Sequence, residues 1–197
     1  KLIETAKAGN ARVAFSTNLD TQWRPIPVLE AEIKGSAAPD EFVLVHGHLD
    51  GWHYGIGDNL TGDATLLELA RVFKQHESGI KRTVKFAWWS GHSHGRYAST
   101  WYADTFALDL AENCVAQVDC DSPGCRWTSV FTDVMWTEEA GPVVKSAIKD
   151  VTGETSKWAR PLRAGDYSFN NLGITGYLML SSTMPDDLRA EKGYYPV

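Results

Sequence analysis

The sequence predicts an α/β fold, a three-layer sandwich with a central mixed, mostly parallel sheet. Short apolar runs bounded by Gly, Asp or Ser are typical of strands that are covered on both faces. Segments with apolar residues at helical spacing alternate with these runs along the chain. Polar motifs follow the runs directly, at the edge where ligands of open α/β sheets bind.

The expected elements follow from these patterns in chain order. Residues 11–15 and 27–33 alternate apolar and polar side chains, and the polar stretch 18–24 between them indicates an antiparallel hairpin. Covered strands of the central sheet are expected at 42–45, 83–89, 115–118 and 174–180. Helices are expected at 61–76, 97–108 and 142–151.

Composition narrows the class of protein further. The 197 residues are 43% hydrophobic and 22% charged, close to globular averages, which excludes disordered, collagen-like and coiled-coil chains. The length fits a single domain spanning residues 1–197. A net charge of −6 disfavours nucleic acid as a partner. We therefore expect a folded domain whose ligand is a small molecule or peptide.

Two features of the chain bear on its location. No apolar run reaches the roughly 18–20 residues that span a bilayer, so no transmembrane segment is expected. The first residues do not resemble a secretory signal, which favours a cytoplasmic location. The missing initiator Met indicates a segment of a longer protein, whose export the sequence does not decide.

The three cysteines, Cys114, Cys120 and Cys125, predict neither a disulfide framework nor a zinc ribbon. Their number is odd, and no two of them have the C-x-x-C spacing. We expect them to be small buried hydrophobic residues.

The first candidate site follows the apolar run at 42–45. Residues 46–59 place three histidines and two aspartates in a loop broken by glycines. Glycine lets the backbone turn sharply, which can bring His48 and Asp58 together around a divalent metal ion. Asp50, two residues after His48 and on the same side of an extended strand, is placed to hold the other ring nitrogen of that imidazole. The alternative is a polar turn of solvated histidines, and Asn59 is interpreted as a turn residue.

Two more polar clusters follow the next two strands. Residues 90–95 contain His92 and His94, and residues 119–124 contain Asp121. Three consecutive strand ends thus bring His or Asp to the same edge of the sheet, which favours a metal site over surface or capping roles. The alternative for Asp121 is a turn residue before a proline.

Five motifs in order resemble the zinc exopeptidase family that includes glutamate carboxypeptidase and the bacterial leucyl-type aminopeptidases. They are residues 40–45, the pair His48 and Asp50, and residues 57–62, 82–89 and 117–121. The resemblance implies an α/β zinc-peptidase core of the phosphorylase/hydrolase-like type with two co-catalytic zinc ions. It implies that His48 and Asp121 bind one zinc, that Asp58 bridges both ions, and that Asp50 orients His48.

The sequence departs from the family at a catalytic position. Members of the family carry two adjacent glutamates after the strand that matches 82–89, the first the general base and the second a zinc ligand. This chain has His92 and Ser93 there. Histidine can accept a proton or bind metal, so His92 is a substitute base or ligand, whereas serine is a poor zinc ligand. His94 is the candidate replacement for the missing ligand; the alternative is a loop without chemistry.

The last zinc ligand of the family, a histidine, has no match among these residues, because no histidine follows His94. Either the segment that bears it lies outside this sequence, or that metal site is incomplete. In aminopeptidase-type members it follows an Asp in a loop resembling 165–169, where this chain has Tyr167. Asp166 is therefore a further candidate metal ligand. Arg96 and Arg163 lie in loops expected to rim the pocket, where either can pair with a substrate carboxylate; the alternative is a solvated side chain.

Together these observations predict a metal-dependent exopeptidase of the aminopeptidase or carboxypeptidase type. It hydrolyses a terminal bond of a peptide or amino-acid-like substrate through a water activated by one or two Zn²⁺ ions, with His92 and Asp50 as catalytic residues. The alternative function is a catalytically impaired member that binds metal or a small ligand. A flavodoxin-like binding module is a third possibility, and the oligomeric state is not predicted.

Overall fold

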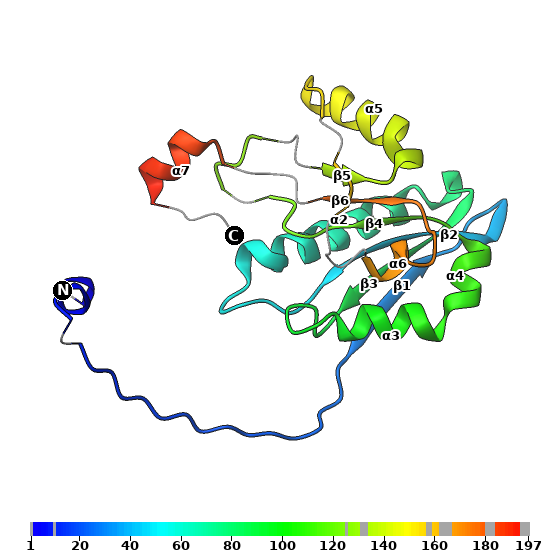
Figure 1. Cartoon of the computed structure of the whole chain (residues 1–197). Helices are drawn as coiled ribbons and strands as arrows, with labels where there is room; N and C mark the ends of the chain where they lie inside the picture. Colours follow the sequence, from blue (N-terminus) through cyan, green and yellow to red (C-terminus); the bar gives the residue numbers. More distant parts are fainter. Residues whose placement is uncertain are drawn as a thin grey trace.

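A computed structural model shows a six-stranded sheet with helices on both faces (Figure 1). The structure describes residues 2–9, 11–124, 126–130, 134–156, 159–161, 167–179 and 184–193. The strands are β1 (Val28–Ile33), β2 (Ala38–His48), β3 (Arg82–Trp89), β4 (Cys114–Asp119), β5 (Val134–Trp136) and β6 (Gly176–Met179), and their order in the sheet is β1-β3-β2-β4-β6-β5.

The sheet is mixed and mostly parallel, as predicted. Strands β3, β2, β4 and β6 run parallel to one another, and the edge strands β1 and β5 run antiparallel to their neighbours. The main helices are α2 (Thr61–Gln75), α3 (Tyr97–Thr105), α4 (Ala107–Asn113) and α5 (Gly141–Thr152). The predicted helix 97–108 is thus two helices, which meet at Phe106.

Shorter elements complete the chain. They are the helices α1 (Leu2–Lys7), α6 (Tyr167–Asn170) and α7 (Asp186–Lys192), the turns η2 (Glu77–Gly79) and η3 (Glu138–Ala140), and the π-type turn η1 (Ile56–Leu60). The short strand β5 was not predicted.

Both faces of the central strands are covered, which explains why these strands are largely apolar. Along β3, Phe86 and Trp88 pack on the face covered by α2, whereas Ala87 and Trp89 pack on the opposite face, against α3, α4 and α6. Figure 1 shows α2 on one side of the sheet and α3 and α4 on the other. A smaller cluster around Trp136 joins β5 to α5.

The predicted first strand is wrong. Residues 11–27 form no regular structure and extend away from the sheet, and Val13 and Phe15 are more than four-fifths exposed (Figure 1). The predicted partner strand does form as β1, but it pairs with β3. An alternation of apolar and polar residues shows only that one face of a segment is suited to burial. A strand also needs a neighbouring strand to pair with, and β1 finds that partner in β3.

Cys114 and Cys120 are buried free thiols, as expected, and Cys125 lies outside the described residues. Among the described helices, none has the length and apolarity required to cross a membrane.

Candidate metal centre

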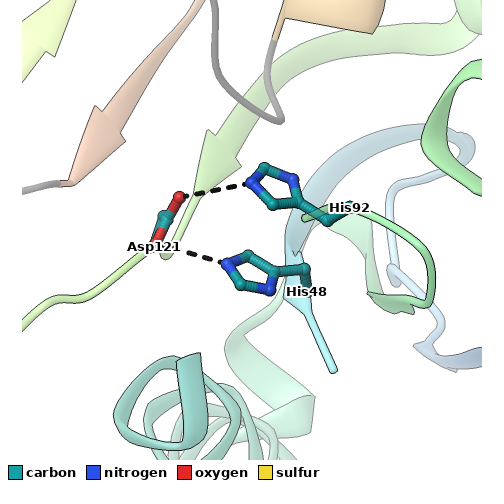
Figure 2. Close-up of side chains that lie close together, drawn as sticks. All are labelled: His48, His92 and Asp121. Atoms are coloured by element: carbon teal, nitrogen blue, oxygen red, sulfur yellow. Dashed lines mark ion pairs between the residues drawn. The ribbon is translucent and has the colours of Figure 1, made fainter. Parts of the chain in front are cut away.

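Three side chains from three strand ends converge at one edge of the sheet (Figure 2). His48 is the last residue of β2, His92 lies in the loop after β3, and Asp121 follows β4. One Asp121 carboxylate oxygen lies 3.5 Å from His48 Nε2, and the other lies 3.9 Å from His92 Nε2. The two imidazole rings stack with centroids 3.9 Å apart. One atom from each residue lies within 4.8 Å of the others, close enough for a shared metal ion.

Asp58 reaches the same place from the loop between β2 and α2. Its Oδ1 lies 2.8 Å from His48 Nε2. The loop doubles back tightly at Gly51. A Cβ atom at this position would lie only 2.6 Å from the carbonyl oxygen of Asp58, which is too close for any other residue. Glycine at this position therefore permits the approach of His48 and Asp58 that the sequence suggested.

Asp50 holds this region together with both its main chain and its side chain. Its carbonyl oxygen lies 2.6 Å from His48 Nδ1 and accepts the Nδ1 proton, so Nε2 is the nitrogen that faces the Asp58 and Asp121 carboxylates. Its carboxylate accepts hydrogen bonds of 2.9 Å from the backbone N–H groups of His92 and Ser93. Burial raises the pKa of Asp50, but these N–H donors outweigh burial and lower it overall.

The residues around His48 fit a divalent cation. His48 Nε2 and Asp58 Oδ1 are both buried and lie 2.8 Å apart, so an imidazole nitrogen and a carboxylate oxygen meet at one point. Burial lowers the pKa of His48, but the Asp121 and Asp58 carboxylates more than offset it and raise that pKa to about 10. The cluster therefore attracts positive charge, and imidazole with carboxylate is a donor set that zinc prefers.

Other predicted site residues lie apart from this cluster or outside the described residues. His94 is exposed and packs against Trp52, with ring centroids 5.4 Å apart. Arg96 begins the turn into α3 and lines a cavity of about 290 Å³ together with Tyr167. Asp166 and Arg163 fall outside the described residues, so their roles remain predictions.

Asn59 is a positioning residue that sequence reasoning missed. Its side chain is buried and donates hydrogen bonds to the carbonyl oxygens of His48, at 3.2 Å, and Cys120, at 2.9 Å. Its Oδ1 accepts a 2.9 Å bond from the N–H of Ser122. Asn59 thus ties the end of β2 to the segment that carries Asp121. Its place in the sequence, directly after Asp58, indicated only a turn.

His46 belongs to the core, although it lies in the same histidine-rich motif as His48. It is fully buried, its Nε2 lies 2.8 Å from Gln117 Oε1, and its Nδ1 accepts a 3.0 Å hydrogen bond from the Trp89 indole. Both ring nitrogens are therefore satisfied in the neutral form. Burial lowers the pKa of His46 to about 4.

This buried histidine predicts a pH dependence of stability. Because the pKa of His46 is about 4 in the folded state and near 6.5 when unfolded, the unfolded chain binds more protons between these values. The free energy of unfolding is expected to fall as pH drops from 6.5 towards 4, with a contribution of up to about 1.4 kcal/mol per pH unit. Urea unfolding across this range measures the slope, and His46→Gln should flatten it. Equal slopes in the two proteins would contradict the prediction.

An α/β sandwich that gathers imidazole and carboxylate side chains at the carboxyl ends of its parallel strands has the architecture of a metal-dependent hydrolase. Comparison with known proteins agrees: the chain belongs to peptidase family M28, whose family model matches residues 29–189. The family that the five sequence motifs indicated is thereby confirmed.

Individual proteins similar to the chain include both exopeptidase types. It is 32% identical over 128 residues to mouse (Mus musculus) aminopeptidase NAALADL1, a match that covers 63% of this chain and 16% of that protein. It is 31% identical over 121 residues to the probable glutamate carboxypeptidase VP8 of Zea mays, covering 59% and 17%. The chain thus spans about a sixth of the length of these relatives.

A solved structure supports the fold. BSAP, a zinc aminopeptidase from Bacillus subtilis, superimposes with a TM-score of 0.67 at 18% sequence identity, and the match covers 81% of this chain and 40% of that one.

Proposed function

We propose that the chain is a single catalytic domain of a zinc-dependent exopeptidase, which hydrolyses the terminal bond of a peptide or a similar small substrate. The observation that carries this proposal is the buried Nε2 of His48, which faces the Asp58 and Asp121 carboxylates at 2.8 and 3.5 Å. Membership of family M28 supports the reaction class.

The residues have distinct roles in this proposal. His48 and Asp121 would hold the metal, with the Asp58 carboxylate beside them, and the metal would supply Lewis-acid polarisation of a carbonyl oxygen and acidify water. Asp50 orients His48 through its carbonyl group and fixes the loop of His92 through its carboxylate. His92 faces the same point and is placed either to accept a proton or to bind metal.

The terminal carboxylate of the substrate is proposed to bind beside Arg96. This residue follows the loop of His92 and lines the cavity that Tyr167 and Ser168 also line. A guanidinium group suits the free carboxylate of a peptide or amino acid. The names of the relatives support aminopeptidase and carboxypeptidase activity alike.

Hydrolysis assays test the proposed reaction. The chain is stripped of metal with a chelator, loaded with Zn²⁺, and assayed on aminoacyl anilides and on N-blocked dipeptides with acidic or apolar C-terminal residues. We expect turnover that depends on zinc and is lost in His48→Ala, with release from only one of the two substrate classes. His76→Ala, at an exposed position after α2, is the matched control and should keep its turnover.

A second candidate function is binding without turnover. The serine at position 93, where the family has a glutamate ligand, favours it. Stoichiometric zinc with no hydrolysis of any substrate would refute the peptidase proposal and support this alternative.

A further inference from the structure

We propose that His92 is itself a metal ligand, and that with His48 and Asp121 it forms a site for a single zinc ion. The inference deepens the proposed function and rests on it for the presence of zinc. In this inference His92 binds the metal ion and does not act as a general base, and the site holds one zinc ion and not two.

The side chains already have the geometry of a shared site. The His48 and His92 rings are nearly parallel, with 5° between their planes, and both present Nε2 to Asp121 (Figure 2). Each nitrogen faces a different oxygen of the same carboxylate, at 3.5 and 3.9 Å. Neither distance is that of a hydrogen bond. The carboxylate therefore lies between the two imidazoles without a close hydrogen bond to either.

The main chain fixes His92 in this position. The Asp50 carboxylate accepts the N–H groups of His92 and Ser93, and the carbonyl oxygen of His92 accepts bonds of 3.1 Å from the N–H groups of Gly95 and Arg96. Gly91 enters this loop with a φ of 75°, a conformation that favours glycine. The imidazole is thus held beside His48 by contacts that do not depend on its own side chain.

The donor set indicates one ion with an open position. Two imidazoles and one carboxylate are three protein ligands, the number that catalytic zinc sites use while they leave a place for water or substrate. Across the parts of the chain that the structure describes, no second group of three such side chains gathers. His94 does not join the cluster, since it is exposed against Trp52.

Metal binding tests this without reference to activity. The metal-free chain is titrated with Zn²⁺ by calorimetry, bound metal is counted by mass spectrometry, and Co²⁺ is used as an absorbing probe of the ligands. We expect one ion per chain. His92→Ala should weaken zinc binding by more than about 100-fold, beyond the effect of losing a residue that only orients a ligand, and should change the Co²⁺ spectrum. His76→Ala should alter neither.

Two further variants keep the result interpretable. His92→Gln retains most of the side-chain volume, and thermal unfolding of the metal-free variants checks that they fold. Unchanged zinc affinity and Co²⁺ spectrum in folded His92→Ala, a loss of binding in His94→Ala instead, or two ions per chain would each overturn the proposal. One-ion binding through His92 without peptide hydrolysis supports the inference and refutes the proposed function, whereas no zinc binding refutes both.

Discussion

Asp121→Asn is expected to lower zinc affinity by more than about 100-fold and to reduce hydrolysis to the metal-free background. Asparagine keeps the shape of the side chain but removes the negative charge that faces both imidazoles. Calorimetric titration with Zn²⁺ and the anilide assay measure the two effects. Asp150→Asn, an exposed change on α5, is the matched control.

The metal-free protein gives an independent measure of the same variant. Burial lowers the pKa of His48, and the Asp121 and Asp58 carboxylates raise it to about 10. Removing one carboxylate should therefore lower that pKa, which NMR titration of the imidazole protons follows. Unaltered zinc affinity together with an unaltered His48 pKa would show that Asp121 does not act on this site.

Asn59→Ala is expected to reduce the free energy of unfolding by roughly 3 kcal/mol. Three main-chain groups, the carbonyls of His48 and Cys120 and the N–H of Ser122, lose their partner inside the protein, at about 1 kcal/mol each. Denaturant unfolding in the presence of a chelator measures the change without a contribution from metal.

A second asparagine provides the control for this variant. The Asn113 side chain donates a hydrogen bond of 2.7 Å to Asp109, so Asn113→Ala should cost about 1 kcal/mol or less. Equal losses in the two variants would contradict the role assigned to Asn59. The space around Asn59 is also full, since a Cβ atom at Gly62 would lie 2.2 Å from its Oδ1.

The central sheet could be predicted because burial on both faces leaves a local signature. The run 83–89 is largely apolar, and the structure places its alternate apolar residues in two separate core clusters. The segment 11–15 carries an equally clear alternation but forms no strand. The pattern of apolar residues in a segment indicates which face is suited to burial. It does not indicate whether another part of the chain covers that face.

The sequence predicts which strand ends carry the site, but not the contacts that each side chain makes there. Parallel strands bring His48, the loop of His92 and Asp121 to one edge, which chain order alone suggests. His46 and His48 lie two residues apart, so they point to the same face of β2 and their types do not distinguish them. Their positions along β2 distinguish them. His46 lies inside the core, where it contacts Gln117 and the Trp89 indole, whereas His48 is the last residue of the strand.

The role of Asn59 illustrates what sequence reasoning lacks. Its bond to the Cys120 carbonyl joins residues 61 positions apart, and the partner is a main-chain atom that every residue type provides. No pattern of side chains indicates such a contact. Only the folded arrangement of β2 and β4 brings the two groups together.

The Asp50 carboxylate has a consequence for how this centre changes over evolutionary time. Its hydrogen bonds go to the backbone N–H groups at positions 92 and 93, which stay in place whatever side chains those positions carry. The loop can therefore carry histidine and serine at these positions and keep its anchor at Asp50, two residues after β2. The position of the loop is thus independent of the side chains that give the centre its reactivity.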